Sequence, residues 1–174
     1  MRSPETDQVF IPPYAQYAER VQASFAKQQI MRLIGAEITR VEPGLVEITL
    51  PFRDDLTQQH GFLHAGVVTT IVDSACGYAA LSLMPEGTGV LSVEYKVNFM
   101  APARGGLFVA QGRVLRAGRT ITVCAGDVLA VQEDPGGSRE FEGAGGQEVV
   151  ATMLATIFSV RERPGVVDYN RAAG

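Results

Sequence analysis

One carboxylate stands alone in the most apolar stretch of this sequence. Asp73 is the only acidic residue between Asp55 and Glu86, and it lies within the apolar segment 65–83. A buried carboxylate costs free energy unless a partner or a chemical step requires it. Its neighbours on a helical face carry no positive charge: Thr69, Thr70, Cys76 and Gly77. The pattern indicates a desolvated acid or base. The competing interpretation is a structural aspartate satisfied by a hydroxyl group or an arginine.

The residues that lead into this segment offer a second chemical feature. A helix that begins near Ala65 presents unpaired backbone N–H groups and the positive end of its dipole, which can stabilise a developing oxyanion. His60 and His64 are four residues apart, but no carboxylate or cysteine follows at ligand spacing, so no metal site is expected. No G-x-S-x-G motif is present, although Ser74 directly follows Asp73.

The elements that must position these groups follow from hydrophobic periodicity. The segment Ala65–Leu83 is apolar almost all round, which is typical of a helix buried on every side. Helical spacing predicts another helix over 14–33, which Gly35 can end, and a hairpin follows over 37–41 and 45–52. Four strand-like runs come later, at 90–100, 107–115, 120–131 and 148–160. We therefore expect an α+β fold in which an antiparallel sheet curls around one central helix.

The chain is expected to form a single domain. Residues 1–13 contain three prolines and are interpreted as an N-terminal arm, residues 14–161 as the domain, and residues 162–174 as a C-terminal tail. Residues 133–147 are rich in glycine and are predicted to form a flexible loop or the tip of a long hairpin.

Composition narrows the class of protein. Hydrophobic residues make up 46% and charged residues 20% of the 174 residues, as in an ordinary globular protein, and the net charge of -4 gives no reason to expect nucleic-acid binding. No signal peptide and no membrane span are evident, so the cytoplasm is the expected location. Cys76 and Cys124 lie in apolar stretches and are interpreted as buried thiols.

Three stretches resemble the hotdog-fold acyl-CoA thioesterases. The segment Gln58 to Asp73, with His64-Ala65-Gly66 in its middle, resembles the H-G-G motif and downstream acid of that family. Residues 91–102 (LSVEYKVNFMAP) resemble the strand after its central helix, and residues 112–120 (GRVLRAGRT) its next hairpin. The similarity runs from about residue 44 to residue 160. It is greatest to the phenylacetate-pathway (PaaI-like) group, which includes mammalian mitochondria-associated acyl-CoA thioesterases.

The resemblance implies a fold, an activity and an assembly. The fold would be a sheet of five or six strands wrapped around one long helix, with an extra N-terminal helix. The reaction would be hydrolysis of an acyl-CoA to a free acid and CoA, without a cofactor, because CoA is part of the substrate. The family also implies a homodimer or a dimer of dimers, in which Asp73 of one chain faces the Ala65 amide of the other.

Site residues are carried over from the same resemblance. Asp73 would be the nucleophile or general base, the Ala65 N–H would polarise the thioester carbonyl, and Gln58 would lie near the reacting centre. His64 would orient that loop or the substrate, and Ser92 would help hold the water. Ala65 replaces the first glycine of the motif, and a position with φ > 0 would not tolerate it. CoA would be contacted by Phe99, Arg104, Arg116, Gly118 and Arg119; the arginines are otherwise solvated charges at strand ends.

Two other functions stay open at this point. A hotdog dehydratase of a hydroxyacyl thioester would need a catalytic histidine in a proline-rich motif, and residues 59–64 contain no proline. A non-catalytic acyl-CoA-binding protein would keep the fold but need an output module. The acyl group is equally open among aryl-acetyl, benzoyl-type and medium-chain groups.

Overall fold

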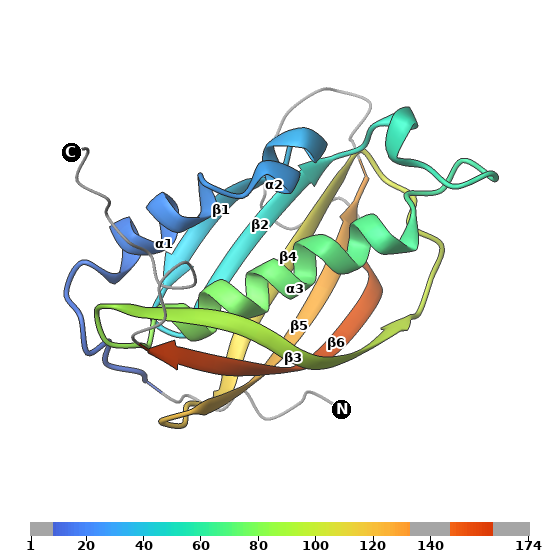
Figure 1. The fold of residues 1–174 in the computed structure, drawn as a ribbon. Helices are drawn as coiled ribbons and strands as arrows, with labels where there is room; N and C mark the ends of the chain where they lie inside the picture. The colour runs from blue at the N-terminus through green and yellow to red at the C-terminus, as the bar shows by residue number, and fades with distance from the viewer. Residues whose placement is uncertain (1–8, 133–146, 162–174) are drawn as a thin grey trace.

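The chain folds into one six-stranded antiparallel sheet that curves around a central helix (Figure 1). This computed structural model describes residues 9–132 and 147–161. The strand order across the sheet is β1-β2-β4-β5-β6-β3, so β1 and β3 are the two edge strands. The long helix α3 lies across the concave face, as the predicted fold requires.

The observed elements match most of the predicted ones within a few residues. The strands are β1 (Glu37–Glu42), β2 (Leu45–Pro51), β3 (Thr88–Phe99), β4 (Leu107–Arg116), β5 (Ile121–Val131) and β6 (Gln147–Arg161). The helices are α1 (Tyr17–Phe25), α2 (Gln29–Ile34) and α3 (Ala65–Leu81), with a short 3₁₀ turn η1 (Asp54–Leu56). The hairpin, the central helix and the four later strands are therefore confirmed.

The predicted single N-terminal helix over 14–33 is wrong, because the structure has two helices. The break falls at residues 26–28, and Gln28 has an extended backbone (ψ 105°) before α2 begins. The apolar spacing had already lost its period here, since Phe25 and Ile30 are five residues apart. Gly35 ends α2 in the left-handed conformation (φ 79°), as predicted.

The N-terminal helices are attached to the end of the central helix. The Arg20 guanidinium donates hydrogen bonds to the carbonyl oxygens of Met84 at 3.0 Å and Pro85 at 2.8 Å, and also to that of Thr88. Val21 is fully buried in the common core. These contacts fix α1 beside α3, so the α1–α2 connection has a defined position over the sheet.

The core lies between α3 and the concave face of the sheet. Ten residues of α3 are buried, and the alternation predicted for β2 places Val46, Ile48 and Leu50 inward with no exposed surface. Cys76 and Cys124 are free and buried, which confirms their interpretation. Desolvation by burial raises the pKa of both thiols, that of Cys124 to about 12.

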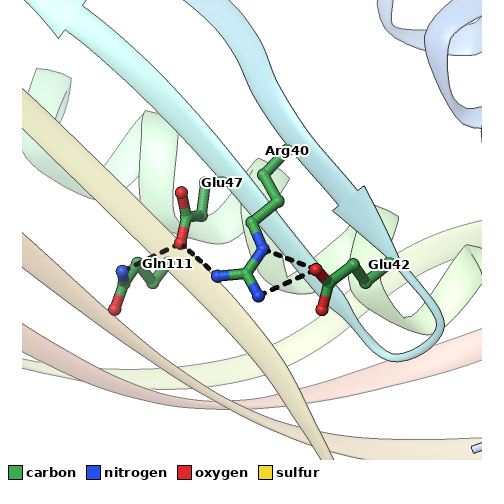
Figure 2. Close-up of polar contacts among 4 residues, drawn as sticks. All are labelled: Arg40, Glu42, Glu47 and Gln111. Carbon is green, nitrogen blue, oxygen red and sulfur yellow. Dashed lines mark hydrogen bonds and ion pairs between the residues drawn. The ribbon is translucent and has the colours of Figure 1, made fainter. Parts of the chain in front are cut away.

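The other face of the sheet carries a polar network (Figure 2). The Arg40 guanidinium contacts the carboxylates of Glu42 at 2.8 Å and Glu47 at 3.3 Å, and Gln111 donates to Glu47 at 3.0 Å. Arg113 pairs in the same way with Asp127 at 2.7 Å. Exposed pairs of this kind contribute about 0–1 kcal/mol each, so these pairs add little to stability.

Several predictions concern residues outside the described ranges. The arm falls partly there (residues 1–8), as do most of the glycine-rich loop (133–146) and the tail (162–174). The domain boundaries therefore stay predictions. Among the described residues, no helix is long and apolar enough to cross a membrane.

Gly112 lets the sheet approach α3 closely, and this gives a stability prediction. A Cβ atom on Gly112 would lie 2.3 Å from the Ala75 carbonyl carbon, whereas one on Gly77 would meet nothing within 4 Å. We expect Gly112→Ala to destabilise the fold by about 1–3 kcal/mol or more, because helix backbone cannot move aside. Gly77→Ala, the matched control, should be neutral or stabilising by up to about 1 kcal/mol.

Thermal unfolding of both variants measures the difference. At about 2–4 °C per kcal/mol for a chain of this size, Gly112→Ala should lower the Tm by several degrees while Gly77→Ala does not. Equal Tm values for the two variants would show that the helix does not depend on this close approach.

Candidate active site

Asp73 lies on the side of α3 that faces the edge strand β3. It comes two and a half helical turns after His64, which places it well inside the helix. Its Oδ1 atom accepts a hydrogen bond of 2.7 Å from the Oγ of Ser92. Ser92 is on β3, directly before an irregularity in the pairing with β6 between Ser92 and Glu94. The structure thus brings together two residues that the sequence places 19 positions apart.

The environment of Asp73 opposes its ionisation. Desolvation by burial raises the pKa of the Asp73 carboxyl, and the hydrogen bond from Ser92 lowers it by a smaller amount. Asp73 is half-buried and forms no ion pair within the residues that the structure describes. A hydroxyl partner is also what a structural aspartate would have. The hydrogen bond alone therefore does not identify the role of Asp73, and the surroundings of the Asp73–Ser92 pair must be considered.

An open cavity of about 530 Å³ adjoins the Asp73 carboxylate. One wall is the N-terminal half of α3, a second is β3 with Tyr95 and Val97, and a third is the α1–α2 region with Gln28 and Ile30. The residues of α3 that line it are Gly66, Thr69, Thr70, Asp73 and Ser74. A partly desolvated carboxylate in the wall of a cavity is a group that can act on a bound molecule.

The start of α3 leaves one backbone donor free. The N–H of Gly66 donates to the His64 Nδ1 atom at 2.9 Å, and the N–H groups of Val67 and Val68 donate to the His64 carbonyl oxygen. The exposed N–H of Ala65 forms no hydrogen bond within the described part of the chain. Ala65 is the first helical residue, so its backbone is not left-handed and alanine fits there.

Gln58, His64 and Ala65 do not line the Asp73 cavity within one chain. The Gln58 side chain accepts a hydrogen bond from the backbone N–H of His60, inside its own turn, and none of these three residues lines the cavity. His64 caps α3 with its Nδ1 atom, so its role here is to fix the start of the helix. Within the described residues, no three His, Cys, Asp or Glu side chains gather closely enough to hold a metal ion.

The predicted CoA contacts fall into two groups at opposite ends of the sheet. Arg104 precedes β4 and its guanidinium lies 4.4 Å from the centre of the Phe62 ring. Arg116 and Arg119 are exposed at the other end of β4, roughly 30 Å away for a strand of this length. Phe99, half-exposed at the end of β3, belongs to the Arg104 group, and Gly118 lies between the other two arginines. One chain does not bring these five residues together.

Sequence reasoning missed the walls of the cavity. Tyr95 and Val97 alternate with Lys96 along β3, and that alternation marks them as one face of the strand. No pattern in the sequence marked Gln28 and Ile30 as cavity residues, because the break between α1 and α2 sets their position.

Comparisons with known proteins agree with this fold. Residues 60–135 match the thioesterase superfamily. A thioesterase family protein from Silicibacter pomeroyi is 46% identical, with a TM-score of 0.75 over 83% of this chain and 98% of that one. The PaaI protein of the E. coli phenylacetic acid degradation operon shares the fold at 16% identity, with a TM-score of 0.69 over 83% and 94% of the two chains.

A curated relative adds evidence from sequence. Human acyl-coenzyme A thioesterase 13 is 30% identical over 113 residues, which cover 63% of this chain and 79% of the relative. The predicted resemblance is therefore confirmed. The chain belongs to the thioesterase superfamily and is a thioester hydrolase of the hotdog fold.

Proposed function

We propose that this protein hydrolyses acyl-CoA thioesters and that Asp73 is its essential carboxylate. The observation that carries the proposal is the half-buried Asp73 carboxylate, hydrogen-bonded to Ser92 in the wall of an open cavity at the start of α3. The name of the human relative supports the acyl-CoA part of the proposal. No cofactor is required, because water and the thioester are the only reactants.

The proposed reaction assigns a role to each group. Asp73 either removes a proton from a water molecule that attacks the thioester carbon, or attacks that carbon itself to form an anhydride that water then hydrolyses. The carbonyl oxygen becomes an oxyanion and accepts a hydrogen bond from a free backbone N–H, for which Ala65 is the candidate. The C–S bond then breaks, and CoA leaves as a thiolate that takes up a proton.

A second copy of the chain completes this site in our proposal. β3 is an edge strand with unpaired backbone groups, and it exposes large apolar side chains: Leu91, Val93, Tyr95 and Phe99. Pairing of two β3 edges would cover them and form a homodimer, or half of a dimer of dimers. Asp73 would then face Ala65 and Gln58 of the partner subunit, which accounts for their separation within one chain.

The same geometry argues against the dehydratase. A catalytic histidine needs a nitrogen that can accept a proton, and Nδ1 of His64 already accepts the hydrogen bond from Gly66. His64 is thus used for the helix start, where it orients the proposed oxyanion donor.

The first prediction concerns the carboxylate. We expect Asp73→Asn to reduce kcat for acyl-CoA hydrolysis by about 10²–10⁴-fold or more, with a small change in KM, because an amide cannot take the proton or form the anhydride. The folded-state pKa of Asp73 is raised, so its ionised form costs stability at neutral pH. The Tm of Asp73→Asn should therefore equal or exceed that of the wild type.

Release of free CoA thiol and the Tm are measured on the same preparation. A structural aspartate would give the opposite pair of results, a lowered Tm with normal turnover per folded molecule.

The second prediction concerns pH. Since Asp73 must be ionised to act, activity should fall as the pH drops through its raised pKa. The hydrogen bond from Ser92 lowers that pKa, so Ser92→Ala should move the acid limb of kcat/KM to higher pH, whereas Ser92→Thr, which keeps a hydroxyl, should move it less. Profiles of kcat/KM measured from acidic to neutral pH test this. An acid limb that is unchanged in Ser92→Ala would show that Ser92 does not influence the group whose titration limits activity.

The third prediction concerns the CoA nucleotide. If Arg116 and Arg119 bind its phosphates, replacing both with alanine should raise KM for acyl-CoA but not for the acyl-pantetheine, which lacks the nucleotide. Added salt should weaken wild-type binding of the full substrate in the same direction. The control is Arg40→Ala with Arg113→Ala, which removes equal charge at two other positions of the sheet, where these arginines pair with carboxylates (Arg40 is drawn in Figure 2). Equal KM changes for both double variants would show that only overall charge matters.

A further inference from the structure

One amide side chain, that of Gln28, links the α1–α2 connection to α3 in the cavity wall opposite β3. Gln28, in the connection between α1 and α2, donates from Nε2 to the Tyr78 hydroxyl oxygen at 2.9 Å and accepts from the Ser74 Oγ at 3.4 Å. Ser74 adjoins Asp73 in the chain, and both line the cavity with Gln28. The amide therefore lies within a few ångströms of the space beside the proposed reacting centre.

The position of this amide is rigidly held. Tyr78 is only 4% exposed, and its ring packs edge-on against Phe25 of α1, with ring centres 5.8 Å apart. The side chain of Gln28 is thus fixed between α1 and α3 before any ligand binds. A hydrogen-bonding group that is already oriented loses little entropy when it meets a ligand.

The Gln28 amide has one N–H group left to donate to a ligand. An amide has two N–H groups, and Gln28 uses one of them on Tyr78. The other makes no hydrogen bond within the described residues. The hydroxyls of Thr69 and Thr70 donate to the helix carbonyls of Ala65 and Gly66, so they are engaged. Among the described side chains that line this wall, the remaining N–H of Gln28 is therefore the free amide donor.

The rest of the lining selects against charge. Ile30 and Val97 are apolar, and among the residues that the structure describes the lining contains no lysine or arginine. The one charged group among these lining residues is the Asp73 carboxylate, which repels an anion. An acyl group with a second carboxylate would meet this repulsion without a compensating cation.

We propose that Gln28 is a specificity-determining residue, and that it favours neutral acyl groups with a hydrogen-bond-accepting oxygen a few carbons beyond the thioester. This inference rests on the proposed acyl-CoA hydrolysis. When a substrate without an acceptor oxygen binds, a buried N–H group of the enzyme is left without a hydrogen bond, and this costs free energy. Enzymes distinguish between substrates with and without the matching atom on that basis. Gln28 contacts the acyl group only, so its effect falls on the choice of substrate and not on the chemical step.

The test uses acyl-CoA substrates of equal chain length. The panel is hexanoyl-CoA, 4-oxohexanoyl-CoA, 5-oxohexanoyl-CoA and the mono-CoA thioester of adipic acid. We expect kcat/KM of the wild type for the better oxo substrate to exceed that for hexanoyl-CoA by about tenfold, the effect of one hydrogen bond. The adipoyl substrate should be the slowest.

Two variants at position 28 and one beside it isolate the amide. In Gln28→Met and Gln28→Ala, the ratio of kcat/KM for the oxo and plain substrates should fall to about one or below. Gln29→Met is the matched control, because Gln29 is exposed and does not line the cavity; its ratio should stay at the wild-type value.

The outcomes separate this inference from the proposed function. Hydrolysis of the panel with no preference for either oxo substrate, or a preference that survives in both Gln28 variants, overturns the inference and leaves the acyl-CoA proposal standing. Failure to hydrolyse any acyl-CoA removes the proposed function and the inference with it.

Discussion

The structure depends on enclosing one helix that is apolar on almost every side. The sheet curves around α3, and at Gly112 and Gly126 its backbone comes so close that no Cβ atom would fit without a shift. The helix is left accessible mainly at its N-terminal half, between β3 and the α1–α2 connection. Asp73 lies on that accessible side, so the packing that holds the fold together also determines the polarity around the carboxylate.

Two opposing effects act on the pKa of the Asp73 carboxyl. Burial disfavours its charge, and a short hydrogen bond from Ser92 favours it, with burial the larger. A carboxylate of this kind is a stronger base than a solvated one, which suits proton removal from water near neutral pH. In the proposed dimer, the free N–H of Ala65 from the second copy would be the complementary group for a developing negative charge.

The sequence was sufficient to predict the helices and strands whose apolar residues recur at a regular spacing. It also pointed to Asp73, a charged residue in an apolar segment. The positions of the central helix and of all six strands follow from hydrophobic spacing, and Asp73 stands out as the one charge in the apolar segment. The break between α1 and α2 was not predicted, although the five-residue gap between Phe25 and Ile30 interrupts the apolar period there, and so Gln28 was missed. The separation of Arg104 from Arg116 was missed for another reason: family resemblance assigned both arginines to one ligand, although the strand predicted over 107–115 lies between them.

Titration of the Asp73 side chain itself is the most direct test of its role as the base. Selective ¹³C labelling of aspartate, with Asp73→Asn to assign the signal, gives its pKa by NMR in the folded protein. We expect a pKa clearly above the ordinary aspartate value of about 3.9, coincident with the acid limb of kcat/KM. An ordinary or lowered pKa, or an acid limb that does not follow it, would contradict the claim that the enclosed helix supplies the catalytic base.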